Sequence, residues 1–479
     1  MSAYRHGNRT LALGFAVVLC IVAPGARWNA RGGVQEPPRP AAGGAPGIDL
    51  DGSRVSPEPI GGPAAPSTTK QSSGELDTSF AGDGTIMTFI PPILDPPGYN
   101  TDIPHAVAID GDGRILVAGV ATEHPFALER YNADGTLDTT FGTDGLATFS
   151  TQWNGEATCM VVQPDGRILV GGGLGAFYAL ARFMPDGSLD PGFGQGGLVQ
   201  QLEPRGTATG IALLPDGRIV LAGGGVGHSL HLSRYESNGL PDDTFGTNGV
   251  VDTGLAASGR LGMARQADGR FVFVFFAGGF RMVRLLSDGS SDAGFGSGGV
   301  VNLPFLGQAV VVQPDGRIFV GGSPWTLPEL PPPPAPTIEG DKATLSPKPS
   351  FAVARFNPDG SLDESFGRKG IVTTSFNGGS LIEALTLDAQ GRLVAAGTTI
   401  SHSGTGDFAL ARYEPDGRLD QSFGKGGRTT ADVDGLGFDD STRAIAVQPD
   451  GRLVVVGAIA IDRAGPLDSF AWGLARFLP

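Results

Sequence analysis

The chain has 479 residues, of which 77 are glycine and 37 are proline, yet 40% of the residues are hydrophobic. Glycine and proline at this frequency interrupt helices, whereas short strands joined by glycine-rich turns accommodate both these residues and a large core. The formal net charge of −15 argues against binding to nucleic acid or to anionic membrane surfaces, because both require a basic surface.

Residues 1–25 have the pattern of an export signal peptide. Basic residues precede the apolar run Leu11–Ala23, and small residues follow it. The run of 13 residues is too short to span a bilayer comfortably. We therefore expect cleavage, an extracellular or periplasmic location and no membrane insertion of the mature chain. Residues 26–75 are rich in Pro and Gly without periodicity, which predicts a disordered linker.

From residue 76 to residue 479 the chain repeats with a period of roughly 50 residues, which is typical of propellers and solenoids. An Asp-Gly-Arg type turn between two apolar runs is followed by a Phe-Ala-Leu-x-Arg-Tyr type strand and then by Leu-Asp-x-x-Phe-Gly, and each signal occurs seven times. The arginines of the second signal are Arg130, Arg182, Arg234, Arg284, Arg355, Arg412 and Arg476. The aspartates of the third are Asp77, Asp138, Asp190, Asp242, Asp292, Asp363 and Asp420.

Each unit contains four strand-like runs. In the first full unit these are Ala106–Ile109, Ile115–Gly119, Phe126–Tyr131 and Leu146–Phe149. An Asp-Gly pair between the first two runs is a strong hairpin signal, and four short antiparallel strands describe one propeller blade. The first run is small and apolar, which suits the crowded strand nearest the central axis.

The two ends of the array predict a closed ring. The repeat begins part-way through a unit, with a strand-like run at Thr85–Phe89, and it stops after the third strand of a unit at Phe477. The early run can therefore complete the last blade and leave no exposed edge. We predict an all-β fold: a single seven-bladed β-propeller, with six or eight blades as the alternatives. The Pro-rich stretch 324–350 is predicted to be a loop insertion.

These motifs resemble the delta-60 repeat family of bacterial proteins. The resemblance rests on Val-Gln-Pro-Asp-Gly-Arg-Ile-Leu-Val, Ala-Leu-Ala-Arg-Phe and Asp-Gly-Ser-Leu-Asp, and a looser likeness extends to NHL-repeat propellers. The resemblance implies a β-propeller and brings no active site with it.

Groups that recur in every unit are expected to be structural. We expect each repeat arginine to pair with the aspartate of the following Leu-Asp turn, in a bidentate contact where geometry allows, and the Phe of Phe-Gly to pack between blades. The single cysteine after the signal, Cys159, stands where other repeats carry alanine, which indicates a small buried thiol.

Functional residues are expected where the repeat is broken. Because connections alternate between the two ends of antiparallel strands, the uniform turns share one face of the ring and the variable connections share the other. Loops held by a rigid scaffold often carry binding. The variable connections are Pro91–Pro104, Thr151–Glu156, Pro324–Ser350, Thr398–Gly406, Ala431–Thr442 and Ile459–Leu467. Among them, the candidate binding residues are Tyr99, Asp102, Trp153 and Trp325.

The densest carboxylate group suggests calcium, which binds several oxygen ligands. It consists of Asp432, Asp434, Asp439 and Asp440, but the spacing lacks the full Asp-x-Asp-x-Asp-Gly pattern. A solvated acidic loop without a metal is the simpler interpretation, and no other cofactor is indicated.

No nucleophile–base pair, metal-ligand spacing or phosphate loop stands out in the sequence. We therefore expect an exported, non-catalytic propeller that binds a protein or a glycan. The alternative is a propeller enzyme, a hydrolase or lyase, with groups such as His105, His124 and His402 meeting in a central pocket.

Overall fold

The computed structural model describes residues 71–90, 102–122, 124–149, 153–224, 229–324, 349–400, 405–435, 437, 439–462 and 469–479. The expected signal peptide, nearly all of the linker and residues 325–348 of the Pro-rich insertion lie outside these ranges. Within the described residues there is no helix, and none that could cross a membrane.

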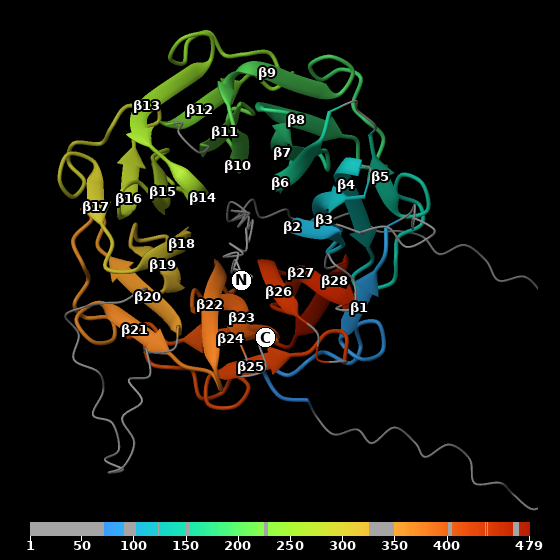
Figure 1. Ribbon diagram of the computed structural model, residues 1–479, viewed down its shortest axis with the longest axis vertical. Helices are drawn as coiled ribbons and strands as arrows, with labels where there is room; N and C mark the ends of the chain where they lie inside the picture. The colour runs from blue at the N-terminus through green and yellow to red at the C-terminus, as the bar shows by residue number, and fades with distance from the viewer. Residues whose placement is uncertain are drawn as a thin grey trace, which may run out of the picture. The chain divides into compact units, whose positions relative to one another are not determined.

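Seven four-stranded antiparallel sheets form the blades of a ring, which confirms the predicted seven-bladed propeller (Figure 1). Blade 1 contains β2 (Ile103–Ile109), β3 (Ile115–Ala121), β4 (His124–Tyr131) and β5 (Leu146–Thr148). Blade 2 contains β6 (Gly155–Val162), β7 (Ile168–Leu174), β8 (Phe177–Phe183) and β9 (Leu198–Arg205). Blade 3 contains β10 (Thr207–Leu213), β11 (Ile219–Gly224), β12 (Ser229–Tyr235) and β13 (Val250–Ala256). Blade 4 contains β14 (Ser258–Arg265), β15 (Phe271–Phe276), β16 (Phe280–Leu285) and β17 (Val300–Asn302).

The remaining blades complete the circle. Blade 5 contains β18 (Leu306–Val312), β19 (Ile318–Ser323), β20 (Phe351–Phe356) and β21 (Ile371–Thr374). Blade 6 contains β22 (Gly379–Leu387), β23 (Leu393–Ile400), β24 (Phe408–Tyr413) and β25 (Arg428–Ala431). Blade 7 contains β26 (Asp440–Val447), β27 (Leu453–Asp462), β28 (Ser469–Phe477) and β1 (Thr85–Thr88).

The first strand of the chain closes the ring, as predicted. β1 pairs antiparallel with β28, from Thr85 opposite Ala475 to Thr88 opposite Trp472. Blade 7 is therefore built from the two ends of the propeller, and its outermost strand is contributed by the start of the repeat array. This arrangement leaves no blade incomplete.

Small residues line the innermost strands because these strands lie closest together around the central opening. At one corresponding position the seven blades carry Ala106, Cys159, Gly210, Gly262, Ala309, Ala384 and Ala444. A Cβ atom added at Gly210 would lie 2.6 Å from the Sδ atom of Met263 in the next blade. The neighbouring innermost strand therefore limits side-chain size at this position.

A β-bulge precedes this small residue in every blade. The register between the first and second strands shifts at the same place in all seven described sheets, for example between Pro104 and Ala106. A bulge redirects the side chain of the extra residue. Six of the residues at the bulges are polar: His105, Thr158, Thr209, Gln308, Glu383 and Arg443.

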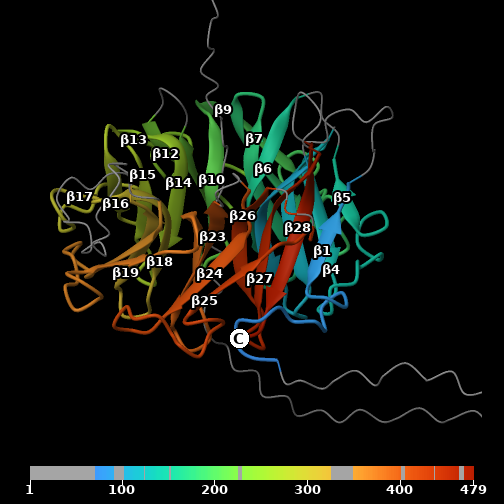
Figure 2. The same cartoon turned by 60° about the horizontal axis from the view of Figure 1, so that its bottom comes forward.

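The connections at the two ends of the strands differ in regularity (Figure 2). On one face, five residues join the first and second strands of every blade, as in 110–114, and fourteen join the third and fourth strands of blades 1–6, as in 132–145. On the opposite face the connections range from the single residue 206 to the 27 residues 324–350. We call these the uniform-turn face and the variable-loop face.

Candidate functional site

The repeat arginines and aspartates form one buried clasp in each blade. An arginine N–H donates to the aspartate Oδ2 atom eight residues later at 2.6–2.8 Å in blades 1–6. In blade 7 the corresponding ion pair uses a different nitrogen, with Arg476 Nη2 lying 2.8 Å from Asp77 Oδ2 across the ring closure. The clasp therefore ties the third strand of each blade to the turn that leads into its outer strand.

The expected bidentate contact is not seen, because a second guanidinium nitrogen is used elsewhere. In blade 1, Arg130 Nη1 donates to the carbonyl oxygen of Pro185 in blade 2, and Arg355 Nη1 donates in the same way to Pro415 in blade 6. The guanidinium also lies over the buried Phe of Phe-Gly, 4.5 Å from the ring centroid of Phe141 in blade 1. Each clasp thus holds its own blade and contacts the next.

The arginine of the Asp-Gly-Arg turn adds a second cation to the same aspartate. Arg218 Nη1 lies 2.9 Å from Asp242, which also accepts hydrogen bonds from Thr244. Burial acts to raise the pKa of Asp242, but these hydrogen bonds and the two arginines hold it well below its ordinary value. The repeated charges are therefore satisfied inside the fold, which makes them structural groups.

Of the four candidate binding residues, Tyr99 and Trp325 lie outside the described residues. The side chain of Trp153 is 49% exposed on the variable-loop face, beside Gly175. Asp102 is fully buried, which corrects the expectation that it belongs to a binding surface. Its carboxylate accepts hydrogen bonds from the backbone N–H groups of Ile90 (3.2 Å) and Thr122 (2.9 Å) and from the Thr122 hydroxyl (3.2 Å).

A second buried carboxylate, Glu129, lies near Asp102 in blade 1. It accepts a hydrogen bond from the hydroxyl of Tyr131, whose oxygen is also 2.7 Å from Thr88 Oγ1 of the closing strand. Burial raises the pKa of Glu129 to about 7, and the charge of Asp102 acts in the same direction. Sequence analysis did not single out this residue, although it breaks the repeat: the corresponding positions of blades 2 and 3 carry Ala181 and Ser233.

The acidic loop between blades 6 and 7 brings three of its four candidate residues together. One carboxylate oxygen each from Asp432, Asp434 and Asp440 lies within 4.8 Å of the others. Asp439 is not part of this group, and its carboxylate accepts a hydrogen bond from the backbone N–H of Gly406 at 3.0 Å. Asp407, which sequence analysis did not single out, acts electrostatically on Asp432 and Asp440.

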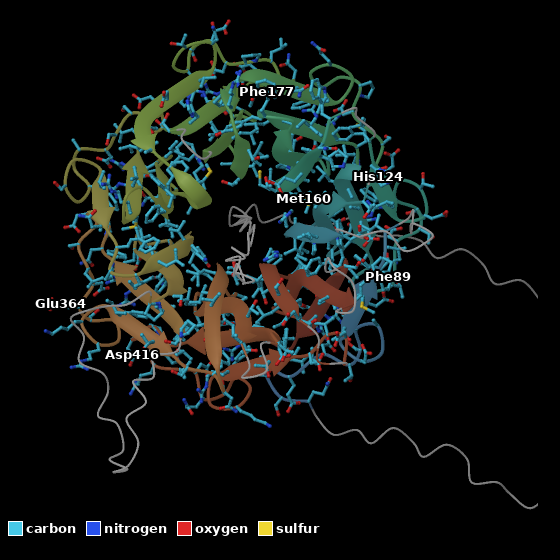
Figure 3. All side chains as sticks on the ribbon, viewed as in Figure 1. Phe89, His124, Met160, Phe177, Glu364 and Asp416 are labelled. Atoms are coloured by element: carbon cyan, nitrogen blue, oxygen red, sulfur yellow. The ribbon has the colours of Figure 1, made fainter. Side chains whose placement is uncertain are left out.

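The described histidines do not meet in a central pocket. His105 lies at the bulge of the innermost strand of blade 1, whereas His124 begins the third strand and lies farther from the opening (Figure 3). His402 lies outside the described residues. His105 has a different neighbour, since its Nε2 atom is 3.8 Å from a carboxylate oxygen of Glu156 in blade 2.

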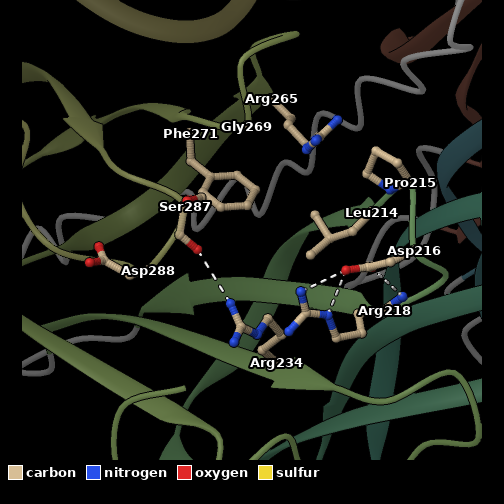
Figure 4. A pocket seen from close by; sticks show the side chains of 10 residues that line it. All are labelled: Leu214, Pro215, Asp216, Arg218, Arg234, Arg265, Gly269, Phe271, Ser287 and Asp288. Atoms are coloured by element: carbon tan, nitrogen blue, oxygen red, sulfur yellow. Dashed lines mark hydrogen bonds and ion pairs between the residues drawn. The ribbon is translucent and has the colours of Figure 1, made fainter. Parts of the chain in front are cut away.

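A cavity of about 230 Å³ opens between blades 3 and 4 on the uniform-turn face (Figure 4). Arg218 and Asp216 form an ion pair of 2.6 Å in its wall, and Arg234 Nη1 donates to the carbonyl oxygen of Ser287 at 3.4 Å. These groups belong to the repeated clasp and its neighbouring turn. The cavity is therefore a gap in the repeat architecture, with the polar groups of the clasp in its wall already engaged.

The ring of blades and the sevenfold clasp define the protein as a β-propeller repeat protein. Five segments, 111–141, 163–193, 214–245, 343–366 and 390–423, match the family described as "Domain of unknown function (DUF5122) beta-propeller". No curated protein matches the chain.

Several solved structures of low sequence identity are similar to the chain. A protein of unknown function from Dyadobacter fermentans shares 12% identity with a TM-score of 0.39, covering 83% of this chain and 98% of its own. A protein of unknown function from Bacteroides caccae shares 13% identity with a TM-score of 0.33, covering 57% and 87%. A structure of BBS1N in complex with ARL6DN shares 11% identity with a TM-score of 0.41, covering 83% and 97%. These similarities bear on no particular activity.

Proposed function

We propose that the protein is an exported, non-catalytic β-propeller that binds a protein or a glycan through its variable-loop face. The observation that carries this proposal is the contrast between the two faces. On the uniform-turn face the connections keep constant lengths of five and fourteen residues, and their recurring charges are used in the clasps. On the variable-loop face the connections differ from blade to blade. A rigid scaffold that carries dissimilar loops at one end is a common arrangement for recognition.

The proposed location is extracellular or periplasmic. It rests on the signal-like pattern of residues 1–25 and includes no membrane insertion after signal cleavage. The net charge of −15 supports a partner other than nucleic acid. We also propose that the repeats are of the delta-60 type, on the motifs Val-Gln-Pro-Asp-Gly-Arg-Ile-Leu-Val, Ala-Leu-Ala-Arg-Phe and Asp-Gly-Ser-Leu-Asp.

The proposal is tested by screening the full chain against glycan and peptide arrays and mapping any ligand by hydrogen exchange. Protection confined to connections of the variable-loop face supports the proposal, whereas protection confined to the uniform-turn face contradicts it. Two exposed side chains give a matched pair of variants. Trp153→Ala on the variable-loop face should weaken binding, and Leu240→Ala on the uniform-turn face, where Leu240 is 58% exposed, should leave it unchanged.

One observation favours the alternative, an enzyme with its site at the central opening. The bulges of three consecutive blades carry Glu383, Arg443 and His105, all at most 4% exposed. Burial lowers the pKa of Arg443 to about 10, and the charge of Glu383 opposes this shift. A hydrolase or lyase would show turnover of esters or polysaccharides that the variant His105→Gln loses. Turnover that persists in this variant would exclude the histidine from such a site.

A further inference from the structure

The acidic group at the junction of blades 6 and 7 has the dimensions of a cation site. Asp432 and Asp434 follow β25, and Asp440 begins β26, so the three carboxylates come from the connection between two blades. Their nearest oxygens lie within 4.8 Å of one another. Oxygens that each lie about 2.4 Å from one calcium ion can be at most about 4.8 Å apart, so this spacing allows all three carboxylates to contact a single ion.

Two carboxylates of this group, Asp432 and Asp440, lie outside the ion pairs that the described residues form. In the described part of the chain, neither Asp432 nor Asp440 forms an ion pair with a lysine, arginine or histidine. The Asp440 side chain is almost completely buried, with 1% of the residue exposed, and its Oδ1 atom has no hydrogen-bond partner. A buried carboxylate oxygen without a donor is costly unless a cation or a proton accompanies it.

Blade 1 contains an equivalent aspartate for which no cation is needed. Asp102 and Asp440 both stand four residues before the small residue of the innermost strand, Ala106 and Ala444 respectively. Each carboxylate accepts a hydrogen bond from a backbone N–H that lies two residues after the end of the preceding outer strand. The donor is Ile90 for Asp102 and Val433 for Asp440.

The two sites differ at the second carboxylate oxygen. In blade 1, Oδ1 of Asp102 accepts hydrogen bonds from the N–H and hydroxyl of Thr122. In blade 7 the residue at that place is Ala460, which has no hydroxyl and whose N–H donates to the carbonyl oxygen of Asp439. The Oδ1 atom of Asp440 therefore lacks the donors that Oδ1 of Asp102 has, and the carboxylates of Asp432 and Asp434 lie near Asp440 instead.

We propose that Asp432, Asp434 and Asp440 bind a calcium ion on the variable-loop face, with Asp407 adding negative charge beside them. Calcium fits because the donors are hard oxygen atoms and because the ion tolerates a loop that supplies part of its coordination, with water completing it. Backbone N–H groups of the same loop hold the carboxylates in place: Gly435 donates to Asp432 at 2.9 Å and Gly437 donates to Asp434 at 3.1 Å. The proposal is independent of which ligand the face binds.

The test is calorimetric titration of calcium into the full chain after treatment with a chelator. We expect saturable binding of one ion. Asp432→Asn changes an exposed side chain, so it should leave the fold intact while weakening calcium binding at least tenfold. Asp440→Asn should weaken it further, and Asp102→Asn is the matched control that should leave the affinity unchanged.

Three results would overturn the proposal. The first is the absence of binding heat and of a thermal shift for the wild-type chain at millimolar calcium. The second is equal calcium affinity in the wild type and in Asp432→Asn. The third is tighter binding of magnesium than of calcium, because it would show an octahedral site for the smaller ion.

Discussion

Blade 6 contains a buried and an exposed ion pair, which together test the structural role of the clasps. Asp420 accepts hydrogen bonds from Arg412 Nε (2.7 Å) and Arg392 Nη1 (2.8 Å), and the side chain of Arg412 is only 2% exposed. Asp416 pairs with Arg418 at 2.8 Å, but these side chains are 47% and 83% exposed. The two ion pairs have similar lengths and differ mainly in burial.

Removing the buried carboxylate should cost far more stability than removing the exposed one. Asp420→Ala leaves the Arg412 guanidinium buried without its counter-charge, and breaking such a pair costs about 3–5 kcal/mol. Asp416→Ala removes a solvated pair and should cost at most about 1 kcal/mol.

Equilibrium unfolding in urea, followed by circular dichroism, measures both changes. The wild type and the two variants should be compared by their midpoints and slopes, since a changed slope would show that the variant no longer unfolds in the same way. If the two variants lose the same stability, the clasps are not the structural groups described here.

Three further outcomes follow from buried groups. In all seven clasps the aspartate pKa lies below its ordinary value. The clasps therefore stabilise the fold above about pH 4, and this contribution is lost as the pH falls through the folded-state pKa values. Circular dichroism should show a steep acid transition, and unchanged stability at pH 2 would contradict this prediction. Because the folded-state pKa of Glu129 is raised to about 7, this residue should reduce the free energy of unfolding by about 1.4 kcal/mol for each unit that the pH rises between about 4.5 and 7. In urea titrations at several pH values, Glu129→Gln should remove this contribution from the slope of stability against pH, and a slope equal to that of the wild type would refute the assignment. The buried Cys159 thiol should react with iodoacetamide only when the protein unfolds, and fast labelling of the native protein would contradict its burial. Cys159→Ala should lower the stability by at most about 1 kcal/mol, because four other blades carry alanine at this position.

The repeat motifs predict the fold in detail because each one specifies a local structure. The Asp-Gly turn fixes a hairpin, with Gly166 at a φ of 83°, and the predicted run Ile115–Gly119 differs from β3 only by two residues at its end. The site is predicted less well because it depends on contacts between blades. Asp407 reaches the acidic group from another connection, and no spacing in the sequence shows this. Aligning Asp102 with Asp440 would have indicated that the two aspartates occupy the same place in the repeat, four residues before the small residue of the innermost strand.

The closing strand makes the completed ring depend on contacts between the two ends of the repeat array. Arg476 donates to the hydroxyl of Ser79 at 3.3 Å across 397 positions of sequence, and β1 can pair with β28 only after every blade between them has been synthesised. Until the two strands pair, β1 and the outer edge of β28 have unpaired backbone groups, which are prone to aggregation. A single proteolytic cut near residue 90 would leave β1 bound by noncovalent contacts alone, so the cut chain should unfold at a lower urea concentration than the intact chain.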